Sequence, residues 1–440
     1  MTTKYESINE KMDVSVAPLP EAALEDLIDQ SEEMKKSCVI SSVMDNEQLT
    51  FFRKSIIDVI RYICINKNAA YGFRVFDNGT KLDHEALVQN VFSQIPRTGD
   101  DGSKWISETF EDRNFGIIMN TSEKFSKPLV DLLSISLEPL LMKVGIPSGG
   151  FHTTTFIGNY GYTPLGIHKD HPGASVLHLH LGPGKKKMYV WDRKYDEAIK
   201  SDRQNLEKHL EYAKEYSFGE GDIFFMPSEH YHIGFTDGYS AALTIWFDSH
   251  SKKSLLTKVL SSLESRYEIQ GFDNEITQPF FTNKPLSFSN IDRVLSSNQQ
   301  LSDRPFNDVL WDAFEDFRLA LISNRGWTSV PLTVEQETGF EIDSDYLTLK
   351  DKCIKVVTPF SILYKVSQER KQIAVYVRGA KIEVNYHSEI IRIINQLNNF
   401  KFIEVTYILS QFENSFPVEA GLYFLAMLYN KQGFEAIDRN

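Results

Sequence analysis

The strongest constraint on the fold is a run of short apolar segments between residues 151 and 247. Gly, Pro and Asp separate them, as expected for strands divided by turns. A charged insertion over 195–216 has a helical pattern and should lie outside the sheets. Many short strands with turn residues between them indicate a sandwich or barrel. The five predicted strands are 151–157, 175–181, 187–191, 222–226 and 241–247.

Helical patterns flank this β region on both sides. Apolar residues recur at helical spacing over 21–36, 46–65 and 126–144, and again over 251–269 and 306–323. The last hundred residues mix both types of element. There we predict strands at 353–364, 372–377 and 380–385, and helices at 388–397, 402–412 and 418–432. The class is therefore α+β.

Charge and cysteine content exclude several classes of protein. The 440 residues carry 60 acids and 47 bases, a net charge of −13, which is the wrong sign for a protein that binds the phosphates of nucleic acid. Cys38, Cys64 and Cys353 lie far apart, which excludes a disulfide framework and a thiolate zinc site. No apolar run reaches the ~20 residues of a membrane helix, and the N-terminus is not a secretory signal. We expect a cytoplasmic protein without nucleic-acid or membrane partners.

Histidine is concentrated in the β region. Nine of the 11 histidines lie between residues 152 and 250. His168 and Asp170 are two apart, so on a strand they face the same side. His230 and His232 follow far downstream. Two histidines and one carboxylate form the facial triad of non-haem Fe(II) enzymes, which leaves coordination positions open.

Four segments together resemble a known family. TPLGIHKD, SVLHLHLGPGKKKMYVW, GDIFFMPSEHYHIGF and AALTIWF are similar, in content and order, to the JmjC-type cupin oxygenases, which use Fe(II), 2-oxoglutarate and O2. The resemblance covers residues 105–250. It implies a double-stranded β-helix, also called a jelly-roll or cupin fold, with the metal at one open end. The family places its last ligand five residues after a proline. From Pro227 this is His232, so the implied metal-binding and catalytic residues are His168, Asp170 and His232, with His230 as the rival.

The resemblance also implies a cation for the distal carboxylate of 2-oxoglutarate. In the family this is a lysine in a G-x-K-x-hydrophobic context, which Gly184, Lys186 and Met188 match. Lys187 is the rival if the strand register slips by one residue. Further candidates for binding the co-substrate are His178, Thr153, Thr155 and Tyr160.

The domain order is similar to that of the ribosomal oxygenases, which hydroxylate protein side chains. This likeness implies four parts. They are a mainly helical region (1–104), the JmjC-like catalytic domain (105–250), a helical dimerisation segment (251–330) and a winged-helix-like domain (331–440). A homodimer is the expected assembly.

These observations favour an Fe(II)/2-oxoglutarate-dependent dioxygenase that hydroxylates a peptide or protein side chain. A free amino acid or a natural-product intermediate is the alternative substrate. A cupin ligand sensor with a DNA-binding winged helix is an alternative of another class, but residues 331–440 hold 12 basic and 14 acidic residues, a poor balance for binding phosphates. A cupin isomerase or dioxygenase without 2-oxoglutarate would use histidines such as His178, His180 and His230. Asp170 and the lysine argue against it.

Overall fold

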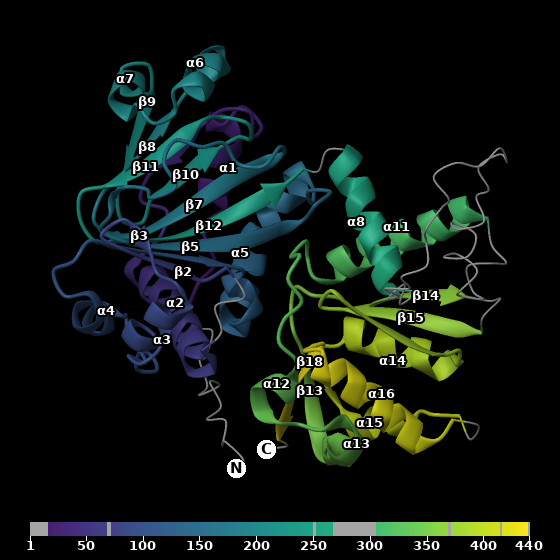
Figure 1. Ribbon diagram of the computed structural model, residues 1–440. Helices are drawn as coiled ribbons and strands as arrows, with labels where there is room; N and C mark the ends of the chain where they lie inside the picture. Colours follow the sequence, from purple (N-terminus) through teal and green to yellow (C-terminus); the bar gives the residue numbers. More distant parts are fainter. Residues whose placement is uncertain are drawn as a thin grey trace, which may run out of the picture.

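The computed structural model describes residues 16–67, 72–249, 252–266, 305–367, 371–413 and 416–438. The chain is a mixed α/β protein with antiparallel sheets. Figure 1 shows a β-rich part that contains the strands up to β12, and beside it a smaller C-terminal part that runs from α12 to β18.

The larger sheet has eight antiparallel strands and a smaller sheet of four strands accompanies it (Figure 1). In spatial order the larger sheet contains β1 (Cys38–Ile40), β10 (Ile223–Met226), β7 (Ala174–Pro183), β12 (Ser240–Asp248), β5 (Phe151–Gly158), β4 (Phe115–Asn120), β2 (Arg74–Asp77) and β3 (Thr80–Lys81). The smaller sheet contains β6 (Gly161–Tyr162), β11 (His232–Thr236), β8 (Lys186–Val190) and β9 (Lys214–Phe218).

The chain passes back and forth between the two sheets. Strands β5, β7, β10 and β12 belong to the larger sheet, whereas β6, β8, β9 and β11 belong to the smaller one. Side chains from both sheets line one cavity. Residues far apart in the sequence therefore meet in the space between the sheets.

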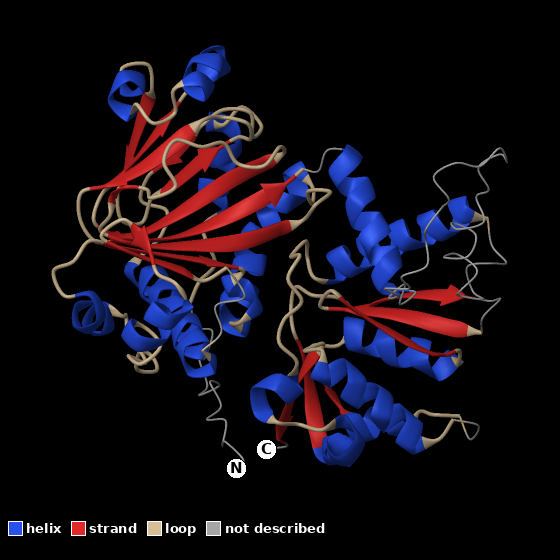
Figure 2. Cartoon of the chain, viewed as in Figure 1, coloured by secondary structure: helices blue, strands red, loops and turns tan. Residues whose placement is uncertain are grey.

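Helices cover the outer face of the larger sheet (Figure 2). On β7, the alternation of leucine with histidine separates the two faces: Leu177, Leu179 and Leu181 belong to the core shared with the helices, whereas His178 lines the cavity. The covering helices are α1 (Glu21–Gln30), α2 (Asn46–Asn66) and α5 (Lys127–Val144), with the shorter α3 (His84–Asn90) and α4 (Ser103–Phe110) nearby.

The C-terminal part contains two three-stranded sheets and five helices among its described residues. One sheet has the order β17 (Phe402–Glu404), β13 (Lys352–Val356), β18 (Phe434–Asp438), and the other β14 (Leu363–Ser367), β15 (Gln372–Val377), β16 (Ala380–Asn385). The helices are α12 (Val334–Thr338), α13 (Ile342–Asp345), α14 (Ser388–Asn399), α15 (Val405–Ser410) and α16 (Val418–Asn430). Before this part, α8 (Lys252–Arg266) packs on α11 (Phe306–Ser323).

The C-terminal part is attached to the β-rich part through buried contacts. Trp327 is 1% exposed and belongs to the same core cluster as the larger sheet. Its indole donates a hydrogen bond to Ser134 on α5 (2.8 Å). The buried Arg378 donates to Asp131 of the same helix (3.0 Å) and lies over the ring of Phe360. The two parts therefore share a core.

Most of the predicted elements are confirmed. The five predicted strands correspond to β5, β7, β8, β10 and β12, and the three N-terminal helices to α1, α2 and α5. The single strand predicted at 353–364 is wrong. A turn at 357–362 divides it into β13 and β14, which join different sheets. The helix predicted over 402–412 begins with β17 instead, and the insertion 195–216 contains α6 (Asp196–Ser201), α7 (Leu206–Leu210) and the start of β9.

Two further results concern the ends of the β region. Strands β1, β2 and β3 come from the region predicted to be mainly helical (1–104), and they are hydrogen-bonded members of the larger sheet. Residues 267–304, about half of the predicted dimerisation segment (251–330), lie outside the described residues. No helix in the described ranges is both long and apolar enough to cross a membrane.

Candidate metal centre

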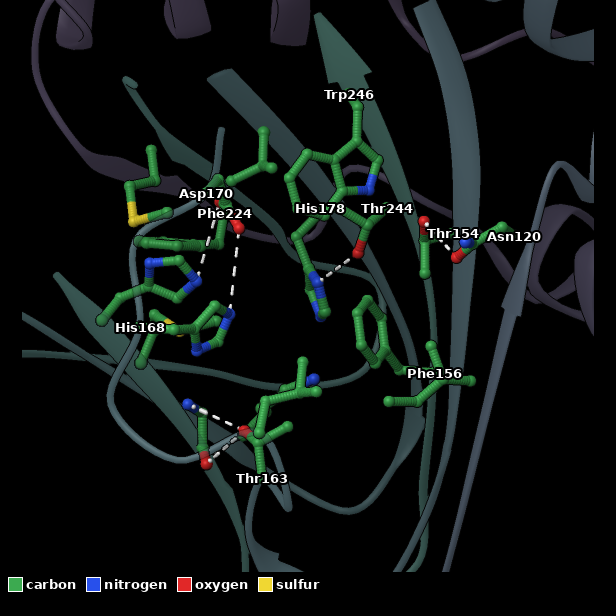
Figure 3. A pocket seen from close by; sticks show the side chains of 18 of the residues that line it. Asn120, Thr154, Phe156, Thr163, His168, Asp170, His178, Phe224, Thr244 and Trp246 are labelled. Carbon is green, nitrogen blue, oxygen red and sulfur yellow. Dashed lines mark hydrogen bonds and ion pairs between the residues drawn. The ribbon is translucent and has the colours of Figure 1, made fainter. Parts of the chain in front are cut away.

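Strand pairing arranges the inner face of the larger sheet in rows. The register of β4, β5, β12, β7 and β10 places Asn120, Thr154, Thr244, His178 and Phe224 in one row across the sheet. A second row on the same face contains Arg74, Ile118 and Phe156. All eight of these side chains line a cavity of about 290 Å³ between the two sheets (Figure 3).

His168, Asp170 and His232 meet at this cavity, as the sequence predicts. One ligand atom from each lies within 4.8 Å of the other two. The Nε2 atoms of His168 and His232 are each 3.8 Å from the Asp170 carboxylate, one facing each oxygen (Figure 3). Residues 168 and 232 also form an isolated backbone bridge, so main-chain hydrogen bonds fix the two histidines beside each other.

Hydrogen bonds fix which nitrogen of each imidazole faces Asp170. Nδ1 of His168 lies 2.8 Å from the carbonyl oxygen of Gly166, and Nδ1 of His232 lies 3.1 Å from that of His230. Because a carbonyl only accepts, each Nδ1 must carry the hydrogen. Burial lowers the pKa of both histidines to about 4, so both rings are neutral at pH 7. Both Nε2 lone pairs therefore point toward the carboxylate.

Three electron-pair donors face one another here without a proton to share. Burial raises the pKa of Asp170 to about 6, and its Oδ2 is buried with no hydrogen-bond partner among the described residues. Such an arrangement is unfavourable unless a cation lies between the donors. The donor set fits a divalent metal ion, with the carbonyls of Gly166 and His230 orienting the two imidazoles from behind.

His230, the alternative to His232 as the third ligand, lies outside the three-residue group. Its Nδ1 lies 3.0 Å from the carbonyl oxygen of Trp191, and it is not part of the three-residue group. His230 precedes β11, whereas His232 is its first residue, and the side chain of His232 is the one that reaches Asp170. Sequence spacing alone did not decide which of the two histidines is the third metal ligand.

Lys186 reaches the same cavity from the smaller sheet. Its side chain is 3% exposed, and its ammonium lies 5.3 Å from the centre of the Phe156 ring. In the described part of the chain no carboxylate pairs with it, and burial lowers its pKa to about 7. Its Cε passes over Gly234, where a Cβ atom would lie only 3.4 Å away. Lys187, the rival, is instead partly exposed and paired with Glu215 (2.9 Å).

His178 also lines the cavity, from β7. Its Nδ1 lies 2.8 Å from the hydroxyl of Thr244 in the neighbouring strand (Figure 3), and its Nε2 is buried without a described partner. Burial, reinforced by the charge of Lys186, lowers its pKa far below the usual value. The ring is therefore neutral, with one unmet nitrogen among the cavity-lining groups.

The structure places three other candidates away from the cavity. Thr153 and Thr155 face the opposite side of β5, where their hydroxyls bond to Glu123 (2.6 Å) and Ser122 (2.8 Å). Thr154, the residue between them, is the one that lines the cavity. Tyr160 packs its ring on Gly116 and Gly158 and does not belong to the cavity lining.

Several lining residues were not predicted from the sequence. Arg74 and Asn120 come from β2 and β4, which were not predicted as strands. Thr163 lines the cavity beside Lys186 and exchanges hydrogen bonds with the backbone of Gly234. The indole of Trp246 lies between His152 and His171, both of which face the Asp248 carboxylate. For Thr163, its position in the turn before the triad was an available signal.

Comparison with known proteins gives structural neighbours only. No protein-family model matches the chain, and no curated protein matches its sequence. The ribosomal oxygenase YcfD from Escherichia coli, in complex with cobalt and succinic acid, is 13% identical with a TM-score of 0.47, covering 94% of this chain and 98% of that one. Its complex with cobalt and 2-oxoglutarate is 12% identical with a TM-score of 0.45, at the same coverage. Similarity at this level does not transfer an activity, so the chemistry has to be argued from the residues of the site.

Proposed function

We propose that this protein is an Fe(II)/2-oxoglutarate-dependent oxygenase that hydroxylates its substrate. One observation carries the proposal. Two neutral imidazoles and a buried carboxylate face one another without a proton to share, in a cavity that also holds a buried lysine with no carboxylate partner among the described residues. The first group requires a cation, and the second requires an anion. A divalent metal and a dicarboxylate co-substrate meet both needs.

His168, Asp170 and His232 would hold the iron. Two imidazoles and one carboxylate suit Fe(II) and leave positions open for other ligands. Fe(II) in this site would supply the oxidation chemistry, in which O2 and 2-oxoglutarate are consumed, one oxygen atom enters a C–H bond of the substrate, and succinate and CO2 are released. The protein's part is to hold the three ligands, to bind the co-substrate and to shield the centre from water.

Lys186 would bind the distal carboxylate of 2-oxoglutarate. A buried cation without an acid is poised for such a charge-assisted hydrogen bond. The lysine extends over Gly234, which is two residues along β11 from His232 and therefore roughly 7 Å away along the strand. A five-carbon dicarboxylate can bridge that separation. His178, whose Nε2 has no described partner, is a second hydrogen-bonding group for the co-substrate.

Apolar side chains surround these polar groups. Phe156, Met188, Phe224, Met226 and Trp246 line the cavity. They lower the local dielectric, which strengthens the interaction of Lys186 with a carboxylate and keeps solvent from the iron site.

The order of the strands supports a double-stranded β-helix for this domain. The alternation of β5 to β12 between two facing sheets, with β6-β11-β8-β9 as the smaller sheet, is the pattern expected of such a jelly-roll. The metal ligands come from the loop before β7 and from the first residue of β11. We propose residues 105–250 as the catalytic domain, with β1, β2 and β3 of the preceding region completing its larger sheet.

For the remaining parts we retain the sequence-based hypotheses. We propose a peptide or protein side chain as substrate, bound with help from a winged-helix-like domain at 331–440, with a free amino acid or natural product as the alternative. We also propose a cytoplasmic homodimer. The exposed Leu256 and Leu260 on α8 and Trp311 on α11 offer apolar surface for a second copy, and the three cysteines are free thiols.

Substitution of single ligands tests the proposed function. His168→Ala, Asp170→Ala and His232→Ala should each lower the affinity for Fe(II) and abolish succinate release from 2-oxoglutarate. His230→Ala is the matched control, since this histidine lies beside the site without facing Asp170. If His230→Ala loses the metal while His232→Ala retains it, the assignment of the third ligand is wrong. If no variant affects metal binding, the proposed function fails.

A further inference from the structure

A second cation faces the cavity, and the proposed reaction does not use it. Arg74 on β2 is half-buried and lines the cavity together with the metal ligands. No carboxylate in the described ranges lies within ion-pair distance of it. Among the described residues, its hydrogen bond runs from Nη2 to Oδ1 of Asn120, at a long 3.4 Å, and its Nε is buried without a described partner. A guanidinium has five N–H donors, and this hydrogen bond uses one of them.

The neighbours of Arg74 form a polar group around it. Thr154 on β5 donates its hydroxyl to the same Oδ1 of Asn120 (3.3 Å; Figure 3). Gly72 leaves room for the Asn120 side chain, because a Cβ at Gly72 would lie 2.7 Å from the amide nitrogen. The Asn120 carbonyl thus holds Arg74 and Thr154 together at one side of the cavity. It supplies no charge to neutralise the guanidinium.

Arg74 and Lys186 enter the cavity from different positions. Lys186 sits over the ring of Phe156. In the register of the larger sheet, Ile118 lies between Phe156 and Arg74, so the backbones of those two residues are two strand spacings, about 10 Å, apart. The two cations also come from different sheets. Each cation therefore approaches the cavity from its own sheet and is available to an anion there.

A charge count of the occupied cavity leaves Arg74 unmatched. Among the described lining residues, Asp170 is the only acid, whereas Arg74 and Lys186 are both cations. A divalent metal adds two positive charges, and 2-oxoglutarate subtracts two. One positive charge then remains, and it belongs to Arg74. A half-buried guanidinium of this kind gains a charge-assisted hydrogen bond when a ligand of opposite charge pairs with it.

We propose that Arg74, together with Asn120 and Thr154, binds the carboxylate of the molecule that is oxidised. The substrate is then an acid, either an acidic side chain of a protein or a free carboxylic acid. This inference rests on the proposed function and defines the substrate class of the same site. In the reaction, one oxygen atom of O2 enters a C–H bond of this acid, the other enters succinate, and 2-oxoglutarate loses CO2.

Paired probes test the inference through binding as well as turnover. One arm uses peptides that differ only by Asp against Asn, or Glu against Gln. The other uses free carboxylic acids against their primary amides. Affinity is measured by calorimetry on the protein with Mn(II) and 2-oxoglutarate bound, under exclusion of O2, and turnover is measured separately as succinate release with Fe(II). The arm in which the acid is preferred identifies the source of the carboxylate.

Four variants distinguish the effect of losing the positive charge of Arg74 from the effect of disturbing the fold. Arg74→Met removes the cation, and Arg74→Lys keeps it. Asn120→Asp changes no shape but places an internal carboxylate at the contact with Arg74, so it should neutralise the guanidinium even if Arg74→Met folds poorly. Arg193→Met is the matched control, because Arg193 lies on the surface in an exposed pair with Glu229.

We expect the wild type to bind the acid of a pair at least tenfold more tightly than its amide. Arg74→Met and Asn120→Asp should abolish this preference, whereas Arg74→Lys should retain part of it and Arg193→Met all of it. The affinity for 2-oxoglutarate should stay within about twofold in Arg74→Met. Equal binding of acids and amides by the wild type would overturn the inference. So would loss of 2-oxoglutarate from Arg74→Met, because Arg74 would then anchor the co-substrate. Acid preference without any 2-oxoglutarate binding would refute the proposed function alone.

Discussion

Replacement of Lys186 by methionine should have two effects of opposite sign. Without ligands, the buried ammonium has no carboxylate partner in the part of the chain that the structure describes, and burial lowers its pKa from an ordinary 10.5 to about 7. A lysine whose pKa falls on folding destabilises the folded protein. The loss is fully present below pH 7 and disappears as the pH rises through 10.5. At 1.36 kcal/mol per pKa unit, the effect is on the order of 3–5 kcal/mol. Lys186→Met should therefore raise the melting temperature of the ligand-free protein at neutral pH.

The same substitution should weaken the binding of 2-oxoglutarate. A hydrogen bond to a charged group contributes about 1.5–3 kcal/mol, which corresponds to a roughly 10- to 150-fold higher Kd. The wild type, in contrast, should be stabilised by about 2.7 kcal/mol when 2-oxoglutarate is present at 100 times its Kd. Thermal melts with and without 2-oxoglutarate, in the presence of Mn(II), measure both effects in one assay.

Lys187→Met is the matched control, since Lys187 is the adjacent lysine and is partly exposed beside Glu215. It should change neither the stability of the ligand-free protein nor the affinity for 2-oxoglutarate by more than a few tenths of a kcal/mol. The reasoning is refuted if Lys186→Met destabilises the ligand-free protein while it leaves the affinity for 2-oxoglutarate unchanged. If Lys187→Met has the larger effect on affinity, the anchor is the other lysine.

Three further predictions concern the cavity wall and the attachment of the C-terminal part. Gly234→Val should weaken 2-oxoglutarate binding at least tenfold in a calorimetric titration. Even a Cβ atom at position 234 would lie 3.0 Å from the Thr163 hydroxyl and 3.4 Å from Cε of Lys186. Unchanged affinity would place the co-substrate elsewhere. Burial raises the pKa of Glu337 to about 7, so the wild type loses stability as the pH rises from 4.5 through 7. Glu337→Gln should therefore stabilise the protein by about 1–2 kcal/mol at pH 8 and little at pH 4. Urea unfolding at both pH values checks this, and an equal effect at each would contradict it. Trp327→Ala should lower stability by about 3–5 kcal/mol, as the indole is 1% exposed in the shared core; a change below 1 kcal/mol in the same assay would show that the two parts fold independently.

The sequence predicts the β region well because its strands alternate clearly. In β7, leucines at 177, 179 and 181 alternate with polar or smaller residues, which predicts both the strand and its buried face. In β5 the three consecutive threonines 153–155 carry no alternation. The interpretation of Thr153 and Thr155 as cavity residues was therefore off by one residue, and Thr154 takes that place.

The site was predictable where its residues lie close together in sequence, and less so elsewhere. His168 and Asp170 follow from their spacing. His232 was assigned from the family's spacing after Pro227, with His230 as the rival, and in the structure it is His232 that faces Asp170. Arg74 and Asn120 could not be assigned, because β2 is only four residues long and both reach the cavity through pairing across the sheet. Such long-range pairing leaves no periodic signal in the sequence.

The central claim is that His168, Asp170, His232 and Lys186 together bind Fe(II) and 2-oxoglutarate. An anaerobic titration of the protein with both, followed by visible absorption spectroscopy, tests it without knowledge of the substrate. We predict an absorption band, typical of Fe(II) with a bound 2-oxo acid, that requires both components. It should be absent in His232→Ala, and in Lys186→Met it should appear only at 10- to 150-fold higher 2-oxoglutarate. A band of unchanged strength in His232→Ala, or none in the wild type at saturating Fe(II) and 2-oxoglutarate, would contradict the claim.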